Sequence, residues 1–174
     1  RRALCVAWSP DGQTLATGSK DTTLCIWDFQ SGTLIHRTMV FATIWSLAWS
    51  PNSETLAIGS FDMQVRLWDI KTKSLLQTFS GHHDYVNSVA WSPDGQLLAS
   101  ASDDMTTRIW DIQKGLMAHD ITESASAIWG VSWSPDNRLL ATASSDMTVK
   151  IWDTQNGENI HIIKNHVDKI WCVA

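Results

Sequence analysis

The chain has 174 residues, a hydrophobic fraction of 44% and a charged fraction of 18%, which is the balance of a folded globular domain. Its formal net charge is −5 and no run of Lys or Arg exceeds two residues, so the clustered cations that bind nucleic-acid phosphates are missing. No apolar stretch approaches the roughly 18 residues of a membrane span. The three cysteines form neither a metal-type pair nor a disulfide framework, and we therefore expect a reducing, cytoplasmic compartment.

Regular spacing accounts for most of the 11 tryptophans. One set precedes Ser-Pro and recurs every 41 or 42 residues, at Trp8, Trp49, Trp91 and Trp133. A second set precedes Asp and keeps the same interval, at Trp27, Trp68, Trp110 and Trp152. A constant interval of this kind is typical of a repeat protein, here with a unit of about 42 residues.

Each repeat unit reads as a small β-sheet. The third unit shows four short segments that suit β-strands, separated by turns rich in Pro, Asp and Gly, at 86–92, 97–102, 106–111 and 116–121. Two of them alternate apolar and polar residues, one is a short apolar run, and the last is weaker. The sequence therefore predicts an all-β chain of four-stranded antiparallel units with no helix longer than one turn.

The Trp-Asp ending of each unit, the Ser-Pro-Asp-Gly turn and the pair Gly81-His82 before the third unit resemble WD40 repeats, the blades of a β-propeller. The resemblance covers the whole chain as a single array. It implies that the first strand of each unit is innermost and lines a central channel. The four implied blades span about 2–40, 41–82, 83–124 and 125–166.

The two ends of the chain share one repeat phase, because residues 168–174 and residues 1–7 both finish in Cys-Val-Ala. We therefore expect residues 168–174 to start a fifth inner strand, and the chain to be part of a larger propeller. Four blades would have to turn about 90° each to close a ring, whereas the family usually has seven or eight. Either further blades complete the ring or two copies pair head-to-tail. The isolated chain is expected to self-associate, with residues 168–174 displaced in such a dimer.

The resemblance also implies a buried, hydrogen-bonded tetrad that is complete only in the third blade, at His82, Ser100, Asp104 and Trp110. In the second blade Val40 and Ile58 replace the His and the Ser, and we expect Asp62 to bind backbone amides or water instead.

A His-Ser-Asp hydrolase triad is the alternative reading of these residues. It is disfavoured because the residues recur with the repeat and no Gly-x-Ser-x-Gly elbow is present. His82 and His83 have no third ligand spaced to join them in a metal site. We expect no catalytic activity, no metal and no cofactor.

Three further tryptophans share one position in the repeat, just after the first apolar residue of the inner strand: Trp45, Trp129 and Trp171. In WD40 propellers this position lies on the top face, around the channel mouth, and contacts partners. The resemblance therefore implies a contact surface at Trp45, Phe61, Asn87, Trp129, Lys20, Asp103 and Ser145. The alternative is that these tryptophans plug the channel or pack against the next blade.

The expected function is a non-catalytic scaffold or sensor that binds a protein or a peptide, rather than a nucleic acid or a membrane. The alternative is a regulatory segment of a larger signalling ATPase or kinase.

Overall fold

Four antiparallel sheets, each of four strands, make up the chain in the computed structural model, which describes residues 2–122 and 126–174. The strands of the first blade are β1 (Ala3–Trp8), β2 (Thr14–Ser19), β3 (Thr23–Asp28) and β4 (Leu34–Met39). Those of the second are β5 (Ile44–Trp49), β6 (Thr55–Ser60), β7 (Gln64–Asp69) and β8 (Ser74–Ser80). Those of the third are β9 (Val86–Trp91), β10 (Leu97–Ser102), β11 (Thr106–Asp111) and β12 (Leu116–Thr122). Those of the fourth are β13 (Ile128–Trp133), β14 (Leu139–Ser144), β15 (Thr148–Asp153) and β16 (Asn159–Lys164).

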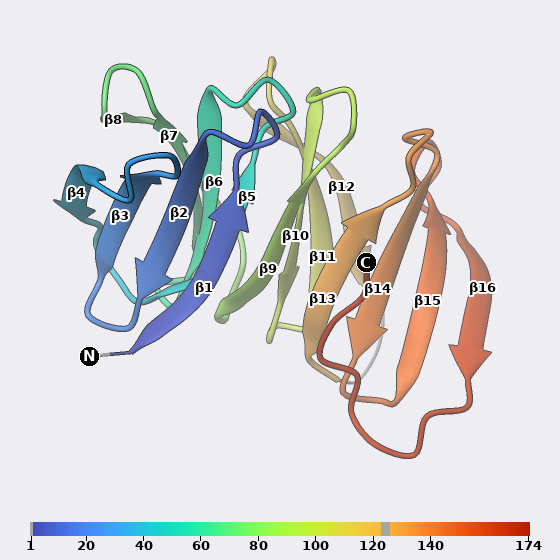
Figure 1. Ribbon diagram of the computed structural model, residues 1–174. Helices are drawn as coiled ribbons and strands as arrows, with labels where there is room; N and C mark the ends of the chain where they lie inside the picture. The colour runs from blue at the N-terminus through green and yellow to red at the C-terminus, as the bar shows by residue number, and fades with distance from the viewer. Residues whose placement is uncertain (1, 123–125) are drawn as a thin grey trace.

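The four sheets are arranged as propeller blades. Figure 1 shows β1, β5, β9 and β13 next to one another around the centre, with β4, β8 and β16 at the periphery. Within each sheet the strands follow one another in sequence order, from innermost to outermost. The described residues contain no helix and hence no membrane-spanning one, and the predicted all-β fold of four-stranded units is confirmed.

The tryptophans that precede Ser-Pro join each blade to the blade before it. Trp49 packs in a buried cluster with Ala16 and Ile26 of the first blade, and its Nε1 donates a hydrogen bond to Ala7 O at 3.0 Å. The same bond recurs at the next two junctions, from Trp91 and Trp133 to the carbonyls of Ala48 and Ala90 at 3.1 and 3.0 Å. The core is therefore made at the junctions between blades, where a large apolar ring is buried with its single donor satisfied.

The tryptophans that precede Asp act inside their own blade. Trp27 and Trp152 donate to a Thr hydroxyl on the second strand, each at 3.0 Å, and Trp110 donates to Ser100 Oγ at 2.8 Å. In the second blade Ile58 takes that position, and Trp68 Nε1 is buried without a hydrogen-bond partner. One of the four Trp-Asp tryptophans therefore has an unsatisfied donor.

Residues 168–174 lie against β13 but belong to no sheet. A Cβ added at Gly130 would come within 3.1 Å of Cys172 Cα and of Val173 N, so the two backbones are in close contact. An inner strand forms its ladder with the second strand of its own blade, and no described residue supplies such a strand here. The segment thus lies beside β13, as β13 lies beside β9, without strand pairing.

Candidate functional site

A β-bulge near the start of every inner strand sets the geometry of one edge of the array. The pairing with the second strand skips a single residue in each blade, at Leu4, Trp45, Asn87 and Trp129. A bulge leaves its extra residue unpaired and re-aims the side chain. The position that the sequence singled out is therefore the bulge itself. The turns between second and third strands lie at the same edge, because Ile44 pairs with Ser60; we call this edge the top surface.

An aromatic stack lies on the top surface across the second and third blades. The rings of Trp45 and Phe61 are 5.2 Å apart at an interplanar angle of 29°, and those of Phe61 and Tyr85 are 4.3 Å apart at 11°. Tyr85 is 40% exposed, whereas the other two rings are half-buried. The repeat pattern does not single out Tyr85, although Tyr85 is the only tyrosine of the chain and directly precedes an inner strand.

The third blade uses its bulge residue differently. Asn87 is buried, and its Nδ2 donates to Asp103 Oδ1 at 2.6 Å and to Ile128 O at 3.0 Å. Both hydrogens of the amide are therefore used inside the molecule. This placement makes Asn87 a link between the third and fourth blades and leaves it out of the exposed contact surface that the resemblance implies.

In the fourth blade the bulge residue is partly covered. Trp129 donates from Nε1 to Ser145 Oγ at 2.6 Å, and its ring centroid lies 4.6 Å from that of Trp171. Trp171 is 59% exposed, so it is the outer ring of this pair. Trp129 and Ser145 are the two predicted contact residues of this blade. They are thus in direct contact with each other, and the terminal segment lies over them. Lys20 has the same position in the first blade as Ser145 in the fourth, and it is exposed.

Three methionines at the same edge hold an unusual backbone conformation. Met63, Met105 and Met147 have φ values of 67°, 70° and 67°, and each follows the turn Asp of its blade. The left-handed region costs a side-chain-bearing residue about 1–2 kcal/mol, which Gly would avoid. All three side chains are exposed, and methionine adapts easily to irregular apolar surfaces. The top surface therefore presents flexible apolar side chains beside rigid rings.

The predicted tetrad residues of the third blade form a continuous chain of hydrogen bonds. Trp110 donates to Ser100 Oγ, which lies 2.7 Å from His82 Nε2, and His82 Nδ1 lies 2.9 Å from Asp104 Oδ2. Burial raises the pKa of the Asp104 carboxyl, but the hydrogen bonds from His82, from Thr106 and from the His83 amide outweigh burial and hold that pKa well below its usual value. The His82 and Asp104 side chains are almost fully buried, and their hydrogen bonds join the segment before β9 to β10 and to the turn that follows it.

Comparison with known protein families provides the assignment. The model of the WDR19 first β-propeller matches residues 4–173, which is almost the whole chain. The chain belongs to this family. A comparison with curated proteins gives no match. The family supports a WD40-type propeller, and such propellers are generally non-catalytic scaffolds for protein interactions. Among the described residues, no group of three His, Cys, Asp or Glu side chains is placed to hold a metal ion.

In this WDR19-type propeller the second blade replaces the missing tetrad members with an ion pair. Arg66 Nη1 donates to Asp62 Oδ1 at 2.9 Å, and Ser60 Oγ donates to the same oxygen at 2.6 Å. Burial raises the pKa of Asp62, but the bonds from Arg66 and Ser60 lower it further than burial raises it. The expectation that Asp62 binds backbone amides or water was therefore incomplete. Without a His, the carboxylate is open to the neighbouring third strand, from which Arg66 reaches it.

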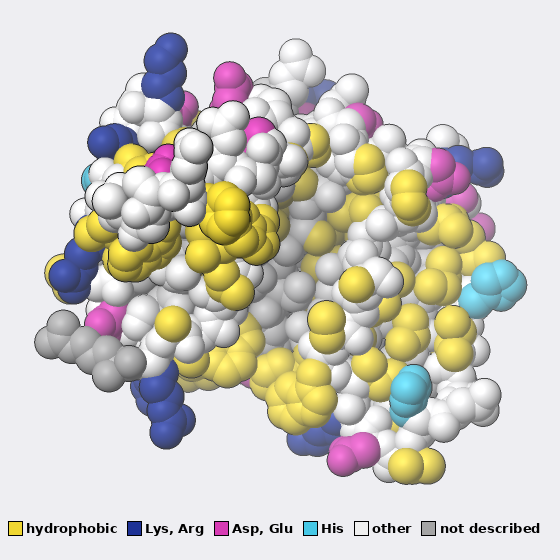
Figure 2. Space-filling model, in the orientation of Figure 1, with side chains coloured by type: hydrophobic (Ala, Val, Ile, Leu, Met, Phe, Trp, Pro, Cys, Tyr) yellow, Lys and Arg dark blue, Asp and Glu magenta, His cyan; other side chains and the backbone are white. Residues whose placement is uncertain are grey.

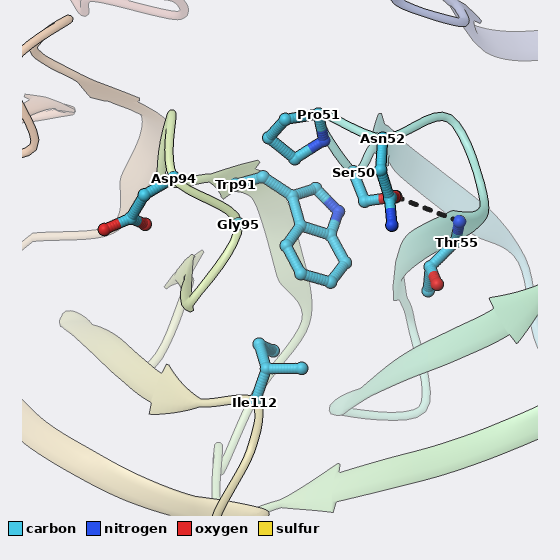
Figure 3. A pocket seen from close by; sticks show the side chains of 8 residues that line it. All are labelled: Ser50, Pro51, Asn52, Thr55, Trp91, Asp94, Gly95 and Ile112. Carbon is cyan, nitrogen blue, oxygen red and sulfur yellow. Dashed lines mark hydrogen bonds between the residues drawn. The ribbon is translucent and has the colours of Figure 1, made fainter.

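The edge opposite the top surface has a cavity of about 240 Å³ between the second and third blades of the WDR19-type propeller (Figure 3). The Trp91 ring lies between Pro51 and Ile112, and its Nε1 is already bonded to Ala48 O. Asp94, the only carboxylate of the lining, points away from the ring in Figure 3. A ligand site needs several polar groups that converge on one point. We therefore interpret this cavity as a gap between the turns of two blades.

Proposed function

We propose that this WDR19-type propeller is a non-catalytic scaffold that binds a protein or peptide partner through its top surface. The Trp45–Phe61–Tyr85 stack is the observation that supports the proposal. Three rings from two blades meet where a bulge turns one of them out of the strand pairing. Trp and Tyr are the residues most enriched at the energetic centres of interfaces, because each buries a large area and keeps a polar donor.

The surroundings of the stack fit the same role. Met63 and Met105 lie in the turns between the second and third strands of the same two blades, and both are exposed at left-handed backbone positions that favour Gly. A rigid aromatic centre costs little side-chain entropy on binding, and the methionines supply adaptable apolar area around it. In the other blades the position of Phe61 is occupied by residues that add polar groups to the rim: Lys20, Asp103 and Ser145.

A displayed library of random dodecapeptides provides a direct test. Peptides selected on the wild-type chain should bind the Trp45→Ala, Phe61→Ala double variant at least about tenfold more weakly, since hot-spot truncation typically costs 2 kcal/mol or more. They should keep their affinity for Trp8→Ala, which removes an equally large exposed ring from a different part of the molecule. Unchanged affinity for the double variant would refute the top surface as the contact site.

A second variant separates contact from stability. Met63→Gly removes an exposed side chain and relieves the positive φ, so it should leave the fold at least as stable as before. Weaker peptide binding by Met63→Gly, with unchanged or increased resistance to urea, would assign the loss to the surface and not to unfolding. Equal binding by Met63→Gly would restrict the contact to the aromatic rings.

A further inference from the structure

The aromatic stack of the top surface ends on an accessible ring. Phe61 stacks with both Trp45 and Tyr85, at centroid distances of 5.2 and 4.3 Å. One face of Tyr85 is therefore covered by Phe61, yet Tyr85 is still 40% exposed, and no other described ring contacts it. The stack thus leaves an open phenol ring just before the inner strand of the third blade.

Two acidic residues are hydrogen-bonded to the backbone of Tyr85. The Oδ1 atom of Asp84 accepts a hydrogen bond from Tyr85 N at 2.8 Å, and Asp103 N donates to Tyr85 O at 3.0 Å. Asp103 Oδ1 also accepts the bond from Asn87 Nδ2 at 2.6 Å. The Oδ2 atoms of both carboxylates accept no hydrogen bond from a described residue, and both side chains are half-buried. Each carboxylate thus keeps one free acceptor oxygen beside Tyr85.

Neither carboxylate is neutralised within the described part of the chain. No Lys, Arg or His there forms an ion pair with Asp84 or Asp103. Arg66, the third-strand cation of the second blade, is paired with Asp62 at 2.9 Å. Arg108, the third-strand cation of the third blade, pairs with a carboxylate of β12 at 3.3 Å. Two negative charges beside an open aromatic ring favour a cation from outside.

These two carboxylates do not belong to the repeat pattern. The corresponding residues of the second and fourth blades are uncharged: Ala42 and Phe61, and Ser126 and Ser145. All three blades nevertheless pair their first and second strands in the same way, with the same bulge. The blade fold therefore does not require a negative charge at either position.

The charge pattern of the wider surface argues for a local contact. Figure 2 shows acidic and basic side chains scattered and mixed over the visible side of the molecule, without a large patch of one sign. The formal net charge of the chain is −5. Separated surface charges are screened by salt, so the attraction of a cationic partner depends on the few charges within the contact itself.

We propose that the partner of the top surface is a peptide segment with an arginine, whose guanidinium stacks on the open face of Tyr85 and pairs with Asp84 and Asp103. The inference rests on the function proposed above and specifies the chemistry of the partner. A guanidinium is planar, so it continues the stack as a further layer while the donors in its plane reach carboxylates at the side. A Lys ammonium has neither the plane nor the fork of donors. An acidic or phosphorylated peptide would be repelled, and a purely apolar one would cover two carboxylates without pairing them.

Selection from the displayed dodecapeptide library tests this chemistry. Peptides selected on the wild-type chain should be enriched in arginine, and peptides selected on the Asp84→Asn, Asp103→Asn double variant should not. Asparagine keeps an oxygen that accepts the same hydrogen bonds, so the double variant removes charge and leaves the local structure in place. The matched control is the Asp94→Asn, Asp136→Asn double variant, which removes two exposed charges from the opposite edge.

The strongest peptide is then labelled with a fluorophore, and its binding is measured by anisotropy as the chain is titrated. Replacing its arginine by glutamine should weaken binding to the wild type about tenfold, but binding to the Asp84→Asn, Asp103→Asn variant at most about twofold, because both changes remove the same contact. Replacement by lysine should weaken binding about threefold, since the charge remains and the stacking is lost. Tyr85→Phe should keep the affinity, and Tyr85→Leu should lower it.

The outcomes separate the arginine contact from the function on which it rests. Peptides that depend on Trp45 and Phe61 but show no arginine enrichment, or that bind the Asp84→Asn, Asp103→Asn variant as tightly as the wild type, overturn the arginine contact and leave the top surface as the binding site. An equal loss of affinity in the control variant also overturns it, because the attraction is then general. A library that gives no peptide dependent on Trp45 and Phe61 overturns both proposals.

Discussion

The second and third blades have the same strands, the same pairing register and the same turns, but different polar interiors. The third blade joins Trp110, Ser100, His82 and Asp104 in one chain of hydrogen bonds. The second keeps the Trp and the Asp, but its Trp68 donor is unpaired and its Asp62 is paired with Arg66. The second blade therefore keeps the blade fold without the network, and its turn carboxylate has a cationic partner in place of the His.

The tryptophan that precedes Asp contributes to stability in two ways, through burial of its ring and through the hydrogen bond of its Nε1, and the two blades differ only in the second. Trp68 still packs against the core of the first junction, and its ring stacks on His36 at 6.1 Å. Its Nε1 donor, however, is buried and unsatisfied, which typically costs about 1–3 kcal/mol. The ring is thus buried or half-buried in all four blades, and the hydrogen bond is an additional contribution that the second blade lacks.

The largest expected effect comes from removing the turn carboxylate. Asp104→Ala leaves His82 and the Thr106 hydroxyl without their acceptor in a nearly dry site, so the free energy of unfolding should fall by about 1–3 kcal/mol. Asp62→Ala should cost less, because the Asp62 carboxylate is 30% exposed and water can take its place beside the guanidinium of the 8% exposed Arg66. Urea denaturation followed by tryptophan fluorescence measures both. Asp168→Ala is the control, because that carboxylate is exposed and accepts its hydrogen bond from the amide of the next residue, Lys169. Equal losses at Asp104 and Asp62 would contradict the contrast between the two blades.

Lowering the pH should destabilise the fold through the same turn carboxylates, with a smaller effect than the substitution. The folded-state pKa of Asp104 is lowered, so its contribution to stability is complete above its unfolded pKa of about 4 and is lost as the pH falls through the folded value. Asp62 and Asp146 have lowered pKa values as well, and they add to the same trend. The urea midpoint should therefore fall from pH 7 to pH 3. The decline should be shallower for Asp104→Asn, and parallel curves for the two proteins would show that this carboxyl does not titrate with folding.

The sequence predicted what is local and repeated. The strands and the turns depend on spacing within one unit, and spacing can be read directly, whereas the tetrad was implied by the resemblance to WD40 repeats. The sequence could not give contacts that depend on which long side chain reaches an open acceptor, as Arg66 does at Asp62. It also could not give those that join neighbouring blades, such as the Phe61–Tyr85 stack and the Asn87 bond to Ile128 O. Two of the four bulge positions were marked by tryptophans, Trp45 and Trp129, but the irregular pairing itself leaves no local signal.

The smallest effect concerns the unpaired donor of Trp68. Thr occupies the position of Ile58 in the first and fourth blades, and its hydroxyl there accepts the Trp Nε1 hydrogen bond at 3.0 Å. Ile58→Thr and Ile58→Val remove similar volume, and they differ mainly by the hydroxyl. A hydroxyl in a core normally makes Thr the less stable of the two, because its desolvation is not repaid.

At position 58 we expect Thr to be at least as stable as Val, since the new bond to Trp68 contributes about 0.5–1.5 kcal/mol and satisfies a buried donor. The matched control is Val65→Thr, at a fully buried site of the same blade, where Thr should cost about 1–3 kcal/mol. The three variants are compared by urea denaturation at pH 7. If Thr is as unfavourable relative to Val at position 58 as it is at position 65, then Trp68 has no unmet hydrogen bond, and the contrast between the two blades reduces to their ion pairs.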